Sequence, residues 1–171
     1  AKLFVAFRPN ENIKNEVKYT TNKSALFIVC VFFAIQISLP LRSVFYPGNI
    51  MWHEQGYRFS WRVMLMEKIG YTTLKIEDND SGKSFYINNS DFLTPFQEKQ
   101  MSFQPDFILE YAHYLGEYYS QQGLKNIKVF AESYVSLNGR KSQKYIDPNV
   151  NLLEVEESFK NKTWIMPLKY D

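Results

Sequence analysis

Aromatic and basic side chains gather in the segment Trp52–Lys68, just after a long apolar run. The charged donors and hydroxyl groups there are Tyr57, Arg58, Ser60, Arg62 and Lys68. A carboxylate that enters a partly dry site needs charge-assisted hydrogen bonds, which such groups supply. The segment therefore could hold an anionic peptide side chain.

The same segment has a plainer interpretation. Trp52, Tyr57 and Trp61 are the side-chain types that form aromatic belts where a protein meets the membrane surface. On the residue types alone, an aromatic belt is favoured over a carboxylate-binding pocket by about two to one. The pocket remains the alternative interpretation.

Other chemistries lack a motif. His53 and His113 are the only histidines and lie far apart in sequence, and His113 is expected to face solvent, so we predict no metal site. No glycine-rich phosphate loop or Gly-x-Ser-x-Gly is present. The net charge of +2 is too small to predict nucleic-acid binding. Cys30 is the single cysteine, so no disulfide can form within the chain.

The apolar run Ala25–Leu41 carries no charge. A helix needs about 17–25 apolar residues to cross a bilayer, and this run just meets that length. A buried core helix and a signal peptide are the alternatives. Glu11 and Glu16 precede the run and no small-residue cleavage site follows it, which argues against a signal peptide.

Basic residues flank the run unequally: Arg8, Lys14, Lys18 and Lys23 precede it, and Arg42 and Arg58 follow it. Because cytoplasmic flanks carry the excess of Lys and Arg, we expect three regions. Residues 1–23 form a cytoplasmic segment, 24–43 the transmembrane helix, and 44–171 an extracytoplasmic domain.

Strand patterns open this domain. Side chains alternate from Tyr57 to Leu65, which indicates a strand, although part of the pattern also suits a helix face. Tyr71–Asp78 and Phe85–Ile87 flank the turn residues Asn79–Gly82 and predict a β-hairpin.

Two helices and a second hairpin follow. Thr94 with Pro95 and Gln97 predicts a capping box, and a longer helix is expected from Pro105 to a stop at Gly123. Asp106 and Glu110 are expected on its solvated face. Strands are predicted over Ile127–Leu137 and Lys141–Ile146, joined at Asn138-Gly139. The predicted fold class is α+β: one N-terminal transmembrane helix, then a mainly antiparallel β domain with two helices.

Several motifs, in order, resemble those of the vitamin K-dependent γ-glutamyl carboxylases. They are Leu39-Pro40, Trp52, the run 56–64 (Gly-Tyr-Arg-Phe-Ser-Trp-Arg-Val-Met), Asp80-Ser81-Gly82-Lys83, the run 134–140, Ile146-Asp147-Pro148 and the run 163–167. The likeness covers about Ile35 to Leu168. It implies the last membrane helix and the following extracytoplasmic domain of such an enzyme, and the composition suggests a bacterial relative.

The resemblance implies a chemistry. In that family, vitamin K hydroquinone reacts with oxygen and becomes the epoxide, the γ-proton of a peptide glutamate is removed, and carbon dioxide adds to the γ-carbon, a reaction of the carbon–carbon lyase class. A desolvated lysine that deprotonates the hydroquinone lies upstream of everything shown here, so this piece is expected to be inert alone. The hydroquinone is expected to be bound mainly by membrane helices outside this sequence.

The resemblance also implies residue roles. Trp52, Tyr57, Ser60 and Trp61 match the family's glutamate pocket in kind, and Lys68 falls where animal enzymes have an arginine. The expected partners are a glutamate-containing peptide or protein and membrane lipid, in a multi-pass protein of the cell membrane. The alternative function is a membrane-tethered, non-catalytic extracytoplasmic binding module.

Overall fold

The computed structural model describes residues 22–62 and 64–170. The chain divides into two compact units, Ala1–Gln36 and Ile37–Asp171. The predicted cytoplasmic segment 1–23 lies, except for its last two residues, outside the described part. Nothing tests the predicted borders between the three regions.

The apolar run forms helix α1, Lys23–Leu41, followed by a 3-10 turn, Arg42–Phe45. By length and composition, the stretch Lys23–Phe45 could cross a membrane. Pro40 is the one buried residue of α1.

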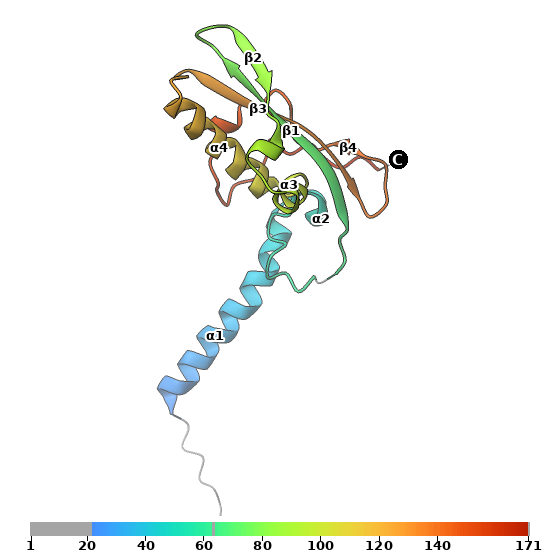
Figure 1. The fold of residues 1–171 in the computed structure, drawn as a ribbon. Coiled ribbons are helices and arrows are strands. Elements are labelled where there is room, and N and C mark those ends of the chain that lie inside the picture. Colours follow the sequence, from blue (N-terminus) through green and yellow to red (C-terminus); the bar gives the residue numbers. More distant parts are fainter. Residues whose placement is uncertain (1–21, 63, 171) are drawn as a thin grey trace, which may run out of the picture. The chain divides into compact units, whose positions relative to one another are not determined.

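The second unit contains a four-stranded antiparallel sheet in the order β2-β1-β3-β4 (Figure 1). The strands are β1, Lys68–Asp78; β2, Lys83–Tyr86; β3, Ile127–Leu137; and β4, Gln143–Lys144. β1 and β3 pair along their full length, from Lys68 opposite Leu137 to Asp78 opposite Ile127. The α+β class with its antiparallel sheet is confirmed.

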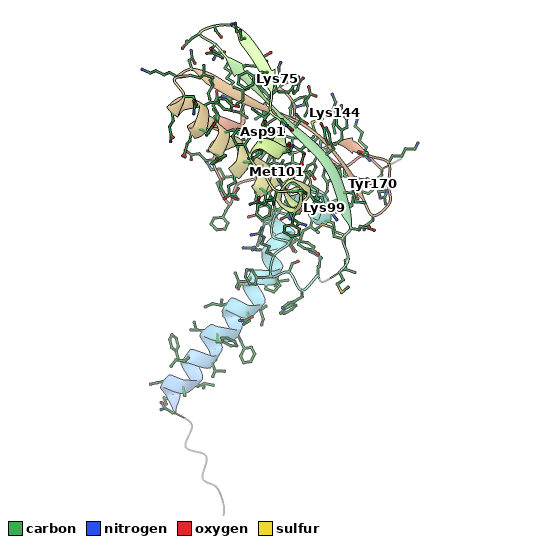
Figure 2. All side chains as sticks on the ribbon, in the orientation of Figure 1. Lys75, Asp91, Lys99, Met101, Lys144 and Tyr170 are labelled. Carbon is green, nitrogen blue, oxygen red and sulfur yellow. The ribbon has the colours of Figure 1, made fainter. Side chains whose placement is uncertain are left out.

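Helices cover one face of this sheet (Figure 1). They are the short α2, Ile50–His53; α3, Pro95–Met101; and α4, Pro105–Gln121. The predicted capping box of Thr94 and Gln97 is present at the start of α3. Met101 at the end of α3 is buried, whereas Lys99 is exposed (Figure 2).

The core lies between the helices and the inner face of β1 and β3. Alternate residues of β1 are buried, among them Thr72, Leu74 and Ile76, while Tyr71 on the other face is exposed. This alternation is the pattern of a sheet with one wet face. It also fixes the direction of Lys68, whose side chain points inward with the core residues.

Three sequence predictions are wrong or too long. The segment from Tyr57 to Leu65 is not a strand: among its described residues, turns and bends run from Tyr57 to Trp61. Phe59, Trp61 and Met64 have φ values of 64°, 57° and 57°, which strand pairing does not allow.

His113 is half-buried and not freely exposed to solvent as predicted. Its Nε2 lies 3.0 Å from the carbonyl oxygen of Leu152 and 2.9 Å from that of Val155, because the C-terminal segment crosses over α4. The predicted strand Lys141–Ile146 is shorter, with only Gln143 and Lys144 in β4. Tyr145 then turns into the core, where its side chain is fully buried.

Candidate functional site

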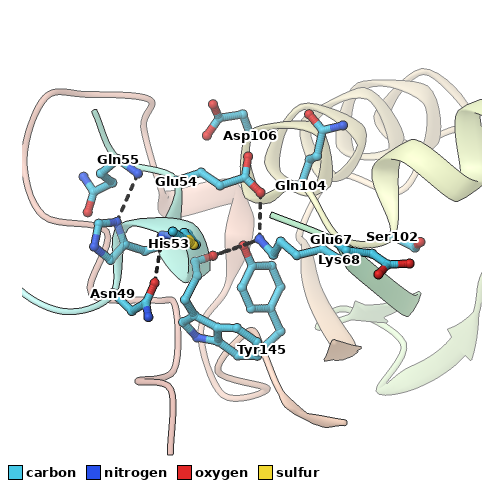
Figure 3. Close-up of polar contacts among 12 residues, drawn as sticks. Asn49, His53, Glu54, Gln55, Glu67, Lys68, Ser102, Gln104, Asp106 and Tyr145 are labelled. Carbon is cyan, nitrogen blue, oxygen red and sulfur yellow. Dashed lines mark hydrogen bonds and ion pairs between the residues drawn. The ribbon is translucent and has the colours of Figure 1, made fainter. Parts of the chain in front are cut away.

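Lys68, the first residue of β1, sits at the centre of a buried polar cluster (Figure 3). Its Nζ donates hydrogen bonds to the Trp52 carbonyl oxygen at 2.8 Å, to Glu54 Oε1 at 2.6 Å and to the Tyr145 hydroxyl oxygen at 2.8 Å. An ammonium group has three protons to donate, so these contacts use its full capacity. The Lys68 side chain is 0% exposed.

Burial and the neighbouring carboxylate have opposite effects on the pKa of Lys68. Loss of hydration lowers the pKa of Lys68 below its ordinary value, and the Glu54 carboxylate raises it again without fully compensating. The Tyr145 pKa is raised well above its ordinary value, chiefly by burial. Tyr145 therefore stays neutral and donates its own proton to the Trp52 carbonyl oxygen at 2.8 Å.

Trp52 supports this cluster as a core residue. Only 2% of it is exposed, and its ring meets the Tyr145 ring edge-on at a centroid distance of 4.9 Å. The indole Nε1 donates to the Met166 carbonyl oxygen at 2.7 Å. Trp52 thereby ties the segment after α1 to the C-terminal segment.

Tyr57, Ser60 and Trp61 lie on the turn segment that follows. Ser60 Oγ donates to the Tyr57 carbonyl oxygen at 2.6 Å, and both residues are half-buried. Trp61 is 75% exposed. Bulky residues seldom adopt positive φ, and such backbone persists where the surroundings hold it.

The surroundings that hold this segment belong to the turn Arg42–Phe45. Arg42 Nη2 donates to the Arg58 carbonyl oxygen at 3.1 Å, and Arg62 Nη1 donates to Ser43 Oγ at 3.3 Å. Gly56 packs so closely that a Cβ there would lie 2.8 Å from the Ser43 Cα. The turn segment is therefore fixed directly against the residues that end α1.

A polar pocket of about 190 Å³ lies beside the buried cluster. Its charged lining residues are Arg42, Glu54, Arg58, Asp106, Glu157 and Lys162. Gln55 braces one wall, because its side chain donates to the Lys160 carbonyl oxygen at 2.8 Å and accepts from the Lys162 amide at 2.9 Å. The pocket can receive a small charged group.

The structure does not gather the five predicted contact residues around one cavity. It places Trp52 and Lys68 together in the interior, Tyr57 and Ser60 on the turn segment, and Trp61 outward. None of the five lines the polar pocket. Their contact with a glutamate side chain stays a prediction.

Sequence reasoning identified Arg58 as a possible donor to a carboxylate but missed most of the other charged residues of the pocket. Asp106, expected on a solvated helix face, forms an ion pair with Lys162. Glu54, which lines the pocket, and Tyr145, which contacts Lys68 beside it, belong to no sequence motif. Arg42 could have been noticed as a cation directly after an apolar helix, where it was counted only for orientation.

The His53 side chain is buried next to this site. Its Nδ1 accepts a hydrogen bond from the Gln55 amide at 3.0 Å, so the proton of the neutral ring is on Nε2. Burial, and then the charge of Lys68, lower the pKa of His53. Among the described residues, no group of three or more histidine, cysteine or acidic side chains could hold a metal ion.

The model of one protein family, described as vitamin K-dependent gamma-carboxylase, lumenal domain, matches residues 21–171, a range that includes every residue the structure describes. No solved structure matches this chain.

Proposed function

The chain belongs to the vitamin K-dependent gamma-carboxylase family as its lumenal domain, and from this we propose that it binds the glutamate side chain of a protein substrate. The parent reaction replaces a proton on the glutamate γ-carbon with carbon dioxide, and it is coupled to the oxidation of vitamin K hydroquinone by molecular oxygen to the epoxide and water. This domain contributes by positioning the glutamate, which lowers the entropic cost of bringing the reactants together.

One observation carries this proposal: the turn segment from Gly56 to Arg62 is locked to the turn Arg42–Phe45. The segment is the one that resembles the family's glutamate pocket. Its attachment presents Trp61 at the point where α1 ends. A binding surface held on a rigid support loses little entropy when its ligand arrives.

The five predicted residues have two different roles in this proposal. Trp61, Tyr57 and Ser60 contact the peptide around the glutamate, because their side chains reach the surface. Lys68 and Trp52 are positioning residues. They do not contact the peptide but hold the backbone between Trp52 and Glu54 in place, because Lys68 binds Glu54 and both Lys68 and Tyr145 bind the Trp52 carbonyl oxygen.

Neither Lys68 nor the polar pocket fits a quinone site. Lys68, the one buried lysine among them, has all three ammonium protons engaged and cannot act as a free base in this arrangement. The polar pocket has charged walls, whereas a quinone ring needs an apolar cavity. We expect vitamin K hydroquinone to be bound by other parts of the enzyme.

The lumenal-domain family and the apolar α1 indicate a membrane protein with an extracytoplasmic domain. We further propose that α1 crosses the cell membrane as one of several spans, with residues 1–23 on the cytoplasmic side. Lipid then surrounds the exposed apolar side chains of α1, such as Phe27 and Ile28.

The test uses the full-length protein in lipid vesicles with vitamin K hydroquinone, labelled bicarbonate and a glutamate peptide. We expect label in the peptide and formation of the epoxide. The control peptide carries glutamine in place of glutamate and should acquire no label. Absence of label in the glutamate peptide contradicts carboxylation, with or without epoxide. Absence of both products favours the non-catalytic binding module instead.

A further inference from the structure

The charges around the polar pocket are unevenly paired. All three carboxylates have lysine partners: Glu54 binds Lys68 at 2.6 Å, Glu157 binds Lys162 at 3.1 Å, and Asp106 also binds Lys162. Among the described residues, none of these carboxylates forms an ion pair with Arg42 or Arg58, although Asp106 and Glu157 share the single charge of Lys162. Buried charged groups are normally paired, so the partly buried Arg42, which has no carboxylate partner among the described residues, is suited to receive an anion.

Arg42 is the more enclosed of the two. One terminal nitrogen donates to the Arg58 carbonyl oxygen at 3.1 Å. Its Nε is buried and has no hydrogen-bond partner among the described residues. A buried donor without an acceptor costs free energy, and a ligand that supplies the acceptor recovers it.

Arg58 completes the arrangement from the turn segment. Its side chain lines the same pocket, is exposed, and makes no hydrogen bond or ion pair with any described residue. The backbone of Arg58 is already held by Arg42, and the neighbouring Gly56 packs on Ser43. The two guanidinium groups are therefore presented from segments that are fixed to each other.

We propose that Arg42 and Arg58 together bind the side-chain carboxylate of the peptide glutamate. The inference rests on the proposed function and names the residues that recognise the substrate. Guanidinium groups suit this role because their planar donors match the two oxygens of a carboxylate. Lys68 does not take it, since its ammonium protons are already used inside the protein.

The experiment measures peptide binding without hydroquinone, so that no chemistry is required. Full-length protein in detergent micelles is titrated with a fluorescent glutamate peptide and with the same peptide carrying glutamine. We expect the wild type to prefer glutamate by about 10-fold or more, the effect of a charge-assisted hydrogen bond. Arg58→Gln, which removes no contact within the protein, should abolish that preference.

Two further variants sharpen the result. Arg42→Gln should also remove the preference for glutamate, and Arg42→Lys, which keeps the charge, should restore part of it. Arg140→Gln is the matched control, because Arg140 is exposed and does not line the pocket. It should bind both peptides like the wild type.

The outcomes separate this inference from the proposed function. If wild-type protein binds both peptides equally, or if Arg58→Gln retains the full preference, the arginine site is wrong even when the enzyme carboxylates peptide. If the preference depends on both arginines but no label enters the glutamate peptide, the carboxylate site stands and the proposed reaction is contradicted.

Discussion

The Lys68 ammonium and the Tyr145 hydroxyl lie 2.8 Å apart in the protein interior, although 77 positions separate them in the sequence. Both groups also contact the Trp52 carbonyl oxygen at 2.8 Å. Three distant segments thus meet at one buried point: the residues after α1, the start of β1 and the segment after β4. This point supports the wall of the polar pocket through Glu54.

Lys68→Met should destabilise the protein strongly. The change removes one member of a buried ion pair and leaves Glu54 without its counter-charge, which costs about 3–5 kcal/mol in comparable cases. Denaturant unfolding of the full chain in detergent micelles, followed by tryptophan fluorescence, gives this value. Lys75→Met is the control, because the pair of Lys75 and Glu77 is solvent-accessible. Equal stability of the two variants would contradict a structural role for Lys68.

The two tryptophans of the segment should separate stability from binding. Trp52→Ala empties a core position and is expected to cost about 3–5 kcal/mol of unfolding free energy. Trp61→Ala changes an exposed side chain and should alter stability by less than about 0.5 kcal/mol. The same variant should weaken binding of the glutamate peptide about 10-fold, as a truncated aromatic anchor does. Unchanged affinity in Trp61→Ala would exclude Trp61 from the binding surface.

Local sequence signals predicted most of the regular structure. The capping box at Thr94 and the strand Ile127–Leu137 follow from neighbouring residues, and both are confirmed. The strand prediction for Tyr57 to Leu65 was wrong because an alternating pattern of aromatic residues can occur in a series of turns as well as in a strand. Its positive φ values depend on contacts with Ser43 and Arg42, which the sequence pattern does not contain.

The sequence indicated which segment contributes to the site, but not which of its side chains are buried or paired. Lys68 was chosen for its charge, and only the strand direction shows that it points inward. Tyr145 and Lys162 reach the site from the C-terminal part of the chain, through tertiary contacts. Residue type therefore located the segment, whereas exposure and pairing required the folded structure.

Two glycines test how tightly the turn segment is held. Gly56 and Gly82 both have positive φ, at 71° and 68°, but a Cβ at Gly82 would meet nothing within 4 Å. Gly82→Ala should cost about 1–2 kcal/mol for its left-handed backbone alone. Gly56→Ala should cost about 1–3 kcal/mol more, because its methyl group overlaps Ser43. Thermal or denaturant unfolding of both variants gives the difference, and similar losses would show that the contact with Ser43 is loose.

His53 should make stability depend on pH. The pKa of His53 in the folded protein lies below the ordinary histidine value of about 6.5, so the unfolded chain binds the proton more readily. The contribution is fully present above pH 6.5 and is lost as the pH falls toward the folded pKa, by at most about 1.4 kcal/mol per pH unit. Unfolding measured from pH 7.5 to 5 should show this slope in the wild type. His53→Gln should flatten it, and an unchanged slope would assign it to other groups.

Photo-crosslinking locates the bound glutamate most directly. A glutamate peptide with a photoreactive residue beside the glutamate is irradiated with the full-length protein in lipid nanodiscs, and the attachment sites are read by mass spectrometry. The account predicts attachment within residues 42–62 or 157–162, prevented by excess glutamate peptide but not by the glutamine peptide. Attachment elsewhere, for instance at Leu93 or Tyr114 between α3 and α4, with the same competition would contradict it.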